Sequence, residues 1–355
     1  MTFVGLDLHK RYITACALDA GGAVLAEAKR LPATLDALGA FLAALRGPAT
    51  VAMEATLYWA WLTERLEAAG FTVQVAHAYQ AKLIGQARSK TDPIDARKLA
   101  ELLRTNLLPT IWVADAATRA RRQLLRGRAF LVRQRTQLKN RIHGHLTAEN
   151  QVCSTTDLYG KAGRTWLTSV ALSPALREQV DVLLRLVDSL SQEIHALDQL
   201  VKRAARGNVV ATQLQSLPGV GPFGALMLEA EIGPIARFRS SHELAAYAGL
   251  VPSTHSSGGR TTHGGVGPAG NRWLKWILIE IVQTLKLAPG PVGAYYQRLL
   301  RAKGKAKATV AAARKLCCYL YWMLKEGWSY AEWLRQHDGS PSSEVRPVQR
   351  MGAVA

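Results

Sequence analysis

The N-terminal third of the chain alternates short apolar segments with amphipathic ones. The segments that predict strands are residues 2–8, 12–18, 23–28, 50–53 and 71–75. The Asp-Ala-Gly-Gly sequence at 19–22 is a hairpin signal, so the first three strands are expected to form a meander. Residues 32–45 and 57–69 carry apolar side chains at helical spacing between the later strands. Strands interleaved with helices predict an α/β layer in which the later strands run parallel.

The pattern changes to long helical periodicity between residues 115 and about 206, where glycine and proline are scarce. Within residues 173–205 an apolar stripe recurs every three or four positions, at Leu183, Leu184, Val187, Leu190, Ile194 and Leu197. We expect an antiparallel hairpin with the preceding helix to bury this stripe. The predicted parts are an α/β domain at 1–112, a basic helical coiled-coil segment at 113–207, a mainly helical domain at 208–336 and a mobile tail at 337–355.

The charge of the chain adds a prediction about its binding partner. Its 355 residues carry 45 Lys and Arg against 26 Asp and Glu, a net charge of +19, which predicts binding to a polyanion such as nucleic acid. Residues 116–145 contain eight arginines and Lys139 and no acidic residue. This run is either a solvated basic helix or a helix laid along a phosphate backbone. The arginines singled out for phosphate contact are Arg119, Arg122, Arg126, Arg133 and Arg141.

Several classes of protein are disfavoured by composition. The four cysteines show neither metal-ligand nor disulfide spacing, and no apolar run reaches the roughly 20 residues that span a bilayer. No secretory leader pattern opens the sequence. We therefore expect a cytoplasmic, nucleoid-associated protein without a membrane partner.

Four carboxylates in the N-terminal third form a candidate metal site. Asp7 lies at the end of the first predicted strand, and Glu54 follows the fourth in the same way. If these strands are neighbours, their carboxylates converge at one edge of the sheet, as ligands of Mg²⁺ or Mn²⁺ require. Asp92 and Asp95 share one face of the first turn of a predicted helix. The alternative for this pair is structural, with Asp92 as an N-cap before Pro93 and Asp95 interacting with the helix dipole.

A glycine-rich segment of the C-terminal third supplies candidate nucleophiles. The expected loop from Ser253 to Arg260 contains Ser256 and Ser257 before two glycines, and a serine hydroxyl can attack a phosphodiester. Arg260, Arg272 and Lys275 lie close by in sequence and are suited to neutralising a phosphate. The alternative is a flexible surface loop.

A second glycine motif precedes this loop. In the sequence LPGVG, Gly219 and Gly221 allow backbone N–H groups to approach a phosphate at a helix N-terminus, as in helix-hairpin-helix modules. An ordinary turn between two helices is the alternative.

Taken together, several motifs resemble the insertion-sequence transposases of the "one-ten" group, which are relatives of the pilin-gene invertases. The motifs are GLDLHK, AMEAT, SKTDPIDARKLAELL, LPGVGP, AYAGLVPSTHSSGG and GPAGNRWLK, and they follow the order of that group over nearly the whole chain. The resemblance implies an N-terminal RNase-H-like (RuvC-like) domain with an Asp-Glu-Asp-Asp site, a coiled-coil connection and a C-terminal transposase domain. The stretch after Arg260 is less basic here than is common in the group.

The same resemblance implies residue roles and partners. It assigns Mg²⁺ to Asp7, Glu54, Asp92 and Asp95, and the nucleophile to Ser257, with Ser256 as second choice. It implies binding to transposon ends and target DNA, a noncoding bridge RNA that guides the reaction, and assembly into dimers or tetramers. The expected activity is DNA strand cleavage and exchange through a covalent phosphoserine, with a site that combines domains of two protomers. The alternatives are a metal-dependent, structure-specific nuclease of the Holliday-junction type without a covalent intermediate, and a non-catalytic nucleic-acid-binding protein.

Overall fold

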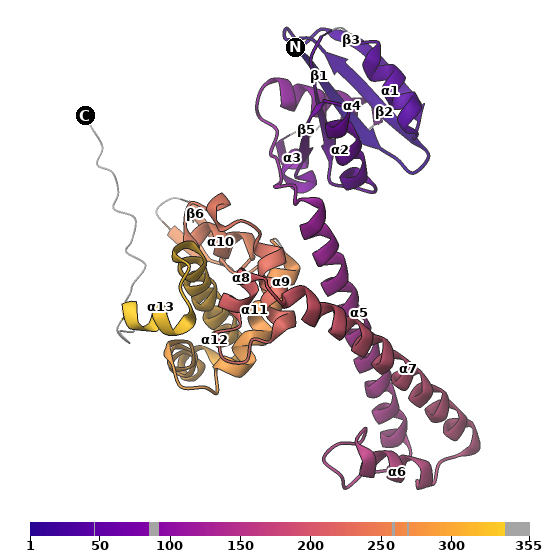
Figure 1. Ribbon diagram of the computed structural model, residues 1–355, viewed down its shortest axis with the longest axis vertical. Coiled ribbons are helices and arrows are strands. Elements are labelled where there is room, and N and C mark those ends of the chain that lie inside the picture. Colours follow the sequence, from indigo (N-terminus) through magenta and orange to yellow (C-terminus); the bar gives the residue numbers. More distant parts are fainter. Residues whose placement is uncertain (46, 85–91, 258–259, 268–269, 338–355) are drawn as a thin grey trace. The chain divides into compact units, whose positions relative to one another are not determined.

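The computed structural model of the chain describes residues 1–45, 47–84, 92–257, 260–267 and 270–337. It divides into two compact units, Met1–Ala114 and Asp115–Ala355 (Figure 1). The tail predicted at 337–355 lies outside the described residues from position 338 onward. None of the described helices is long and apolar enough to cross a bilayer.

A five-stranded mixed sheet forms the centre of the first unit. Its strands are β1 (Thr2–Leu8), β2 (Tyr12–Leu18), β3 (Val24–Pro32), β4 (Ala49–Glu54) and β5 (Thr72–Ala76). They lie in the order β3-β2-β1-β4-β5, with β1 antiparallel to β2 and parallel to β4, and with β4 parallel to β5. The α/β layer predicted from the sequence is confirmed, including the meander and the parallel later strands.

Helices cover both faces of this sheet (Figure 1). Helices α1 (Leu35–Ala43) and α2 (Trp59–Ala68) pack on Val4, Leu6 and Leu8 of β1, whose side chains alternate to one face. Helix α4 (Asp92–Arg104) packs on the opposite face of β1 and β2. A short helix, α3 (Ala78–Ile84), was not predicted from the sequence.

Helix α4 approaches β1 very closely because Gly5 has no side chain. A Cβ atom at Gly5 would lie 2.0 Å from the carbonyl oxygen of Ala96 and 2.6 Å from the amide nitrogen of Ala100. Both contacts are with helix backbone, which cannot move aside alone. Gly5 therefore fixes the spacing at which α4 lies over the sheet.

The second unit begins with a long helical hairpin. Helix α5 (Ala116–Ala148) packs against α7 (Pro174–Ala205), and the short α6 (Lys161–Ser169) lies between them in sequence. Arg128 pairs with Asp198, and Arg135 donates to Ser191, further back along α7. Ile142 packs with Leu184, further back again. As residue numbers rise along α5, those of the contacting residues on α7 fall. The two helices are therefore antiparallel, as the apolar stripe predicted.

In the described part of the second unit, the helical hairpin is followed by further helices and one small β-hairpin. The helices are α8 (Val209–Leu214), α9 (Pro222–Ile232), a 3₁₀ turn (Ile235–Arg237), α10 (Ser241–Tyr247), α11 (Arg272–Leu285), α12 (Pro291–Glu326) and α13 (Tyr330–Gln336). Strands β6 (Thr254–Ser257) and β7 (Arg260–His263) pair as an antiparallel hairpin. Helices α9, α11 and α12 share one large apolar core. The described residues of this segment are mainly helical, as the sequence predicted.

We expect replacement of Gly5 by alanine to destabilise the first unit. The added methyl group collides with the backbone of α4, and overpacking of this kind costs about 1–3 kcal/mol. Urea unfolding of the full chain, followed by circular dichroism, measures this loss.

The matched control is Gly39→Ala, because Gly39 is exposed in the middle of α1 and its Cβ would meet no atom within 4 Å. Alanine there should leave the stability unchanged or raise it by up to about 1 kcal/mol. Equal effects of the two substitutions would show that the close approach of α4 is not a constraint.

Candidate functional site

The backbone brings the four predicted carboxylates to one edge of the sheet. The parallel pairing of β1 with β4 ends at Leu6 and Met53, so Asp7 and Glu54 are the next residues on the two neighbouring strands. Alternation along each strand places both on the α4 face, since Gly5 and Ala52 contact that side. Asp92 and Asp95 occupy the first turn of α4. The site residues therefore come from two strand ends and one helix start.

A histidine that was not predicted lies between two of these acids. The Nε2 atom of His9 is 3.0 Å from Oδ2 of Asp7 and 3.2 Å from Oδ2 of Asp92. Tyr12 stacks on the His9 ring and donates a hydrogen bond of 3.0 Å to Asp92, and Tyr58 donates to the backbone oxygen of His9. These contacts hold the strand end and the helix start together.

The electrostatics of the cluster suit a cation. Burial is the largest cause that raises the pKa of Asp7; nearby His9 lowers it, and the charges of Asp92 and Asp95 raise it further. Ligand atoms of Asp7, His9 and Asp92 lie within 4.8 Å of one another. Carboxylate oxygens are the ligands that Mg²⁺ and Mn²⁺ prefer, so the donor set fits such an ion. The imidazole fits best as a hydrogen-bond partner of the carboxylates.

The predicted serine loop is a β-hairpin in the structure. Ser256 pairs with Thr261, and Ser257 pairs with Arg260 in the ladder of β6 and β7. Backbone hydrogen bonds between Ser253 and both Gly264 and Gly265 extend the ladder. Two glycines separate the strands, and a Gly-Gly pair between short polar runs is a hairpin signal that the sequence interpretation overlooked. Gly258 and Gly259 themselves lie outside the described residues.

The chain is fixed where it returns from this hairpin. The backbone N–H of Asn271 donates to the Tyr247 carbonyl at 2.7 Å, and the side-chain Nδ2 of Asn271 donates to the Tyr247 hydroxyl at 3.1 Å. The Oδ1 atom of Asn271 caps α11 by accepting from Trp273 and Leu274. Thus the end of α10 and the start of α11 form a fixed base for the serine hairpin.

This base is connected to α5 through a fully buried carboxylate. Glu231 of α9 is 0% exposed and accepts two hydrogen bonds, of 2.8 and 2.9 Å, from Arg126. It also accepts one of 2.8 Å from Asn271. Arg122 adds an ion pair at 3.6 Å and a hydrogen bond to the Ala230 carbonyl. We call Glu231, Arg122, Arg126 and Asn271 the Glu231 network.

The network changes the interpretation of the basic helix. Arg122 and Arg126 were expected to contact phosphate, but in the structure their guanidinium groups bind a buried acid on α9. Arg121 likewise pairs with Glu229, and Arg128 with Asp198. The acidic partners were missed because they lie about 70–109 residues away in sequence.

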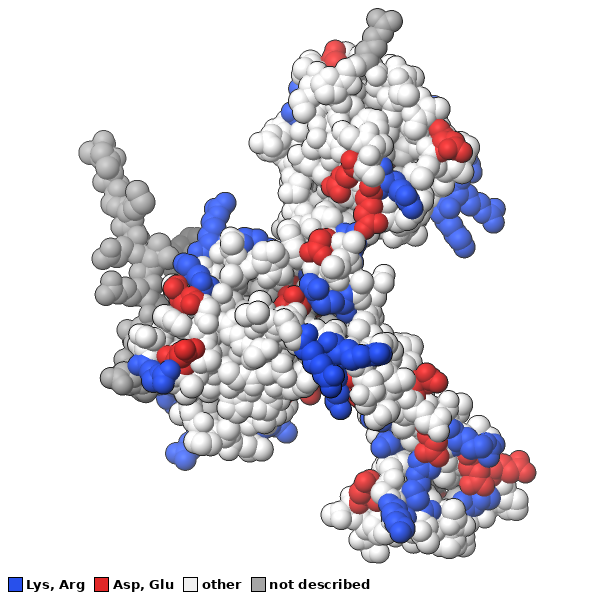
Figure 2. All heavy atoms as spheres, viewed as in Figure 1, with Lys and Arg blue, Asp and Glu red and all other residues white. Residues whose placement is uncertain are grey.

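The other predicted phosphate contacts remain at the surface or near it. Arg133, Arg141 and Arg272 are exposed, and Arg119 is half-buried. Lys275 donates to the Gly267 carbonyl at 3.0 Å, while nothing is described of the Arg260 side chain. On the face shown in Figure 2, Lys and Arg side chains gather over the middle of α5 and α7 and again near α6.

The LPGVG motif forms the connection between α8 and α9. Gly219 has a φ of 78°, and a Cβ there would lie 2.4 Å from Thr284, so only glycine fits this turn. Gly221 is exposed and precedes α9 without a side-chain cap. The adjoining hollow has a volume of about 280 Å³ and is open to solvent. The arrangement leaves the backbone at the start of α9 accessible.

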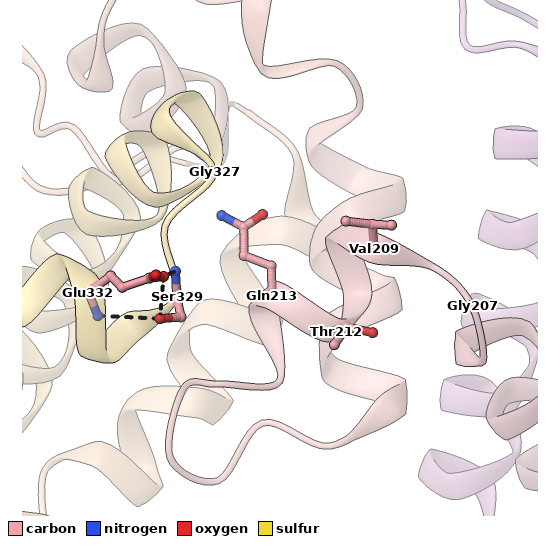
Figure 3. Close-up of a pocket in the computed structure, with 7 residues that line it drawn as sticks. All are labelled: Gly207, Val209, Thr212, Gln213, Gly327, Ser329 and Glu332. Atoms are coloured by element: carbon pink, nitrogen blue, oxygen red, sulfur yellow. Dashed lines mark hydrogen bonds between the residues drawn. The ribbon is translucent and has the colours of Figure 1, made fainter.

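A second hollow, of about 370 Å³, has polar groups that are already engaged (Figure 3). Ser329 and Glu332 hydrogen-bond each other as the capping box of α13. The Gln213 amide donates to the carbonyls of Met323 and Trp328. These contacts close the core of the second unit, so they do not offer a set of ligand-binding groups.

Sequence reasoning missed His9, Tyr12, Glu231 and Asn271. For His9 the signal was its place two residues after Asp7. For Glu231 it was one of two acids, with Glu229, inside the mainly apolar run from Phe223 to Ile232. A charged residue there requires a buried partner, which the arginine-rich helix supplies.

Comparisons with known proteins match both parts of the chain to family models of transposases. Residues 4–150 match a family model described as "Transposase", and residues 211–297 match one described as "Transposase IS116/IS110/IS902 family". The first stretch contains all four acids and the second contains the serine hairpin.

Curated relatives carry corresponding names. The chain is 29% identical to a probable family 20 transposase of Pseudomonas aeruginosa over 301 residues, which cover 80% of this chain and 86% of that protein. It is 28% identical over 302 residues to a putative transposase of Sinorhizobium fredii, covering 80% of this chain and 75% of the relative. A pilin gene-inverting protein of Moraxella lacunata is 29% identical over 142 residues, which are 39% of this chain and 44% of that protein.

We expect Asp7→Asn to stabilise the metal-free protein at neutral pH. A raised pKa means that Asp7 contributes stability below its unfolded-state pKa and loses it as pH rises through the folded value. At pH 7 the buried carboxylate therefore lowers stability, and the neutral amide removes that effect. Thermal melting in chelator should show a higher midpoint for the variant, and a lower one would contradict this expectation.

The same melts with millimolar Mg²⁺ test the metal site. Binding to the folded state should raise the midpoint of the original protein but not that of Asp7→Asn. Asp36→Asn is the control, because Asp36 is an exposed carboxylate in α1, and it should retain the full response. A magnesium shift that survives Asp7→Asn would exclude Asp7 as a ligand.

We expect Glu231→Gln to destabilise the second unit strongly. It leaves two arginines beside a buried site without their counter-charge, and breaking a buried ion pair costs about 3–5 kcal/mol. Urea unfolding measures the loss. Glu193→Gln removes an exposed carboxylate on α7 and should change stability by no more than about 0.5 kcal/mol. A small effect at Glu231 would mean that the network is not a structural centre.

Proposed function

This chain belongs to the IS116/IS110/IS902 family of transposases, and from that premise we propose that it cleaves and exchanges DNA strands at the ends of an insertion sequence. One observation carries the proposal. The acid cluster and the serine hairpin, which supply different chemistry, each lie within a stretch that matches a transposase family model. Hydrolysis by the acids alone would not require the second stretch.

The proposed reaction begins at a serine. The Oγ atom of Ser257 forms a bond to the scissile phosphorus, and the bond from phosphorus to the 3′ oxygen breaks. The serine proton passes to solvent, and the departing oxygen takes up a proton as a 3′-hydroxyl. The resulting phosphoserine ester retains the energy of the phosphodiester, so the strand can be joined to a new 3′-hydroxyl without an external cofactor.

The acids have a distinct part in this proposal. Asp7, Glu54, Asp92 and Asp95 would hold Mg²⁺, which supplies charge neutralisation at the phosphate when bound. His9 and Tyr12 orient the carboxylates of Asp7 and Asp92 through the hydrogen bonds described above. The placement of these acids at two neighbouring strand ends and in the first turn of α4 supports the proposal of a RuvC-like nuclease domain.

The serine hairpin receives its own support. Hydrogen bonds between Asn271 and Tyr247 join the two chain segments that flank the β6–β7 ladder. Rigid elements position a nucleophile more reproducibly than a free loop does. We further propose, on the family resemblance, that a bridge RNA selects the DNA and that the active assembly is a dimer or tetramer.

The decisive experiment traps the covalent intermediate. The full chain is incubated with Mg²⁺ and DNA carrying the ends of its own insertion sequence, and the adduct is mapped by mass spectrometry. We expect the adduct on Ser257 and its complete loss in Ser257→Ala, because alanine has no hydroxyl. Ser256→Ala should retain it. Prior treatment of the protein with ribonuclease should abolish the adduct if RNA guides the reaction.

The outcomes separate the candidate activities. Strand cleavage that persists in Ser257→Ala without an adduct would mean that the acid cluster activates water, as in a structure-specific nuclease. An adduct lost only in Ser256→Ala would transfer the nucleophilic role to its neighbour.

A further inference from the structure

Helix α12 contains a sharp bend with a strongly basic surface. Gly304 has φ 74° and ψ 167°, which is not helical, and it separates two helical limbs within Pro291–Glu326. The side chains on either side are Arg298, Arg301, Lys303, Lys305 and Lys307, and all five are exposed. We call residues 298–307 the basic elbow.

The cations of the elbow form no ion pair with any residue that the structure describes. None of Arg301, Lys303, Lys305 and Lys307 has a carboxylate partner among the residues that the structure describes. Arg298 lies over the ring of Tyr295, at 5.2 Å from its centroid. The sequence from 281 to 325 holds nine Lys and Arg and no Asp or Glu, so no acid near in sequence is available. This contrasts with Arg121, Arg122, Arg126 and Arg128 of α5, which are paired internally.

The bend is built into the sequence at a glycine. A φ of 74° is a left-handed conformation that other residues rarely adopt, although a Cβ at Gly304 would meet no atom within 4 Å. Glycine is therefore required at position 304 for its backbone conformation, because there is room for a side chain. Buried Val292 and Tyr296 precede the elbow, and buried Ala308 and Ala312 follow it. Both limbs are thus held by the core while the bend projects into solvent.

We propose that the basic elbow binds the phosphate backbone of double-stranded DNA. A duplex carries one negative charge per about 1.7 Å of its axis, twice the density of one strand, and so complements five cations within ten residues. Recognition of single strands relies on aromatic stacking, and residues 297–318 contain no aromatic side chain. The elbow therefore grips the backbone without reading bases. This proposal rests on the proposed transposase activity only for the choice of DNA as the partner.

Salt-dependent binding tests this surface. The triple variant Lys303→Gln, Lys305→Gln and Lys307→Gln is compared with the original full chain on a duplex carrying the ends of the insertion sequence. Loss of each phosphate contact lowers the slope of log affinity against log salt by about 0.9, so we expect a decrease of about 2–3. Between about 50 and about 200 mM salt, the ratio of the two dissociation constants should then change by up to about 40-fold.

A matched variant separates local contact from net charge. The substitutions Lys202→Gln, Arg203→Gln and Arg206→Gln remove three exposed cations near the end of α7. They should change the slope by less than about 1. Gly304→Ala keeps every charge but strains the bend, and it should also weaken binding. Urea unfolding of each variant confirms that the fold is retained.

The result that overturns the proposal is equal salt slopes for the elbow variant and the α7 variant. The same measurement is made on an RNA duplex of the same length. If the elbow variant loses affinity for that RNA but not for the DNA duplex, DNA is not the partner of the elbow. Because binding is measured without strand cleavage, a failure here is distinct from a failure of the serine mechanism, which the covalent adduct reports.

Discussion

A single buried carboxylate organises the second unit of this protein. Glu231 is wholly removed from solvent, and a charge in that position is tolerable only when its hydrogen bonds are complete. Arg122 and Arg126 approach it from α5, and Asn271 approaches from the start of α11. These partners join the helical hairpin to the base of the serine hairpin. The location of the proposed nucleophile is therefore tied to the packing of a helix more than 100 residues earlier in the chain.

The first unit also depends on a single residue, Gly5. Glu231 organises its surroundings by what it binds, whereas Gly5 does so by lacking a side chain. The resulting close approach places the first turn of α4, with Asp92 and Asp95, over the edge where β1 and β4 end. Asp7 is partly buried there beside other acids, which raises its pKa in the metal-free protein. Such a site is less stable without a cation, as is common where binding is the function.

The sequence predicted the elements whose signal is periodic and missed those whose signal is a long-range contact. Apolar alternation located β1 and β2 to the residue, and the stripe on α7 predicted its antiparallel partner. The placement of Asp7 and Glu54 at the ends of neighbouring strands followed from the strand pattern alone. In contrast, His9 was overlooked because its role depends on a helix about 83 residues away. The β6–β7 hairpin was interpreted as a loop because glycine content outweighed the strand tendency of Thr261 and Thr262.

The arginines show most clearly why composition alone does not reveal the partners of a basic segment. Residues 116–145 carry nine cations and no acid, yet several of those guanidinium groups neutralise acids on α7 and α9. Four of the nine cations in this run, Arg121, Arg122, Arg126 and Arg128, have carboxylate partners within the second unit. Residues 281–325 contribute nine positive charges and no negative ones. The sequence therefore shows where positive charge accumulates, and the contacts of the folded chain show which of those cations are already paired.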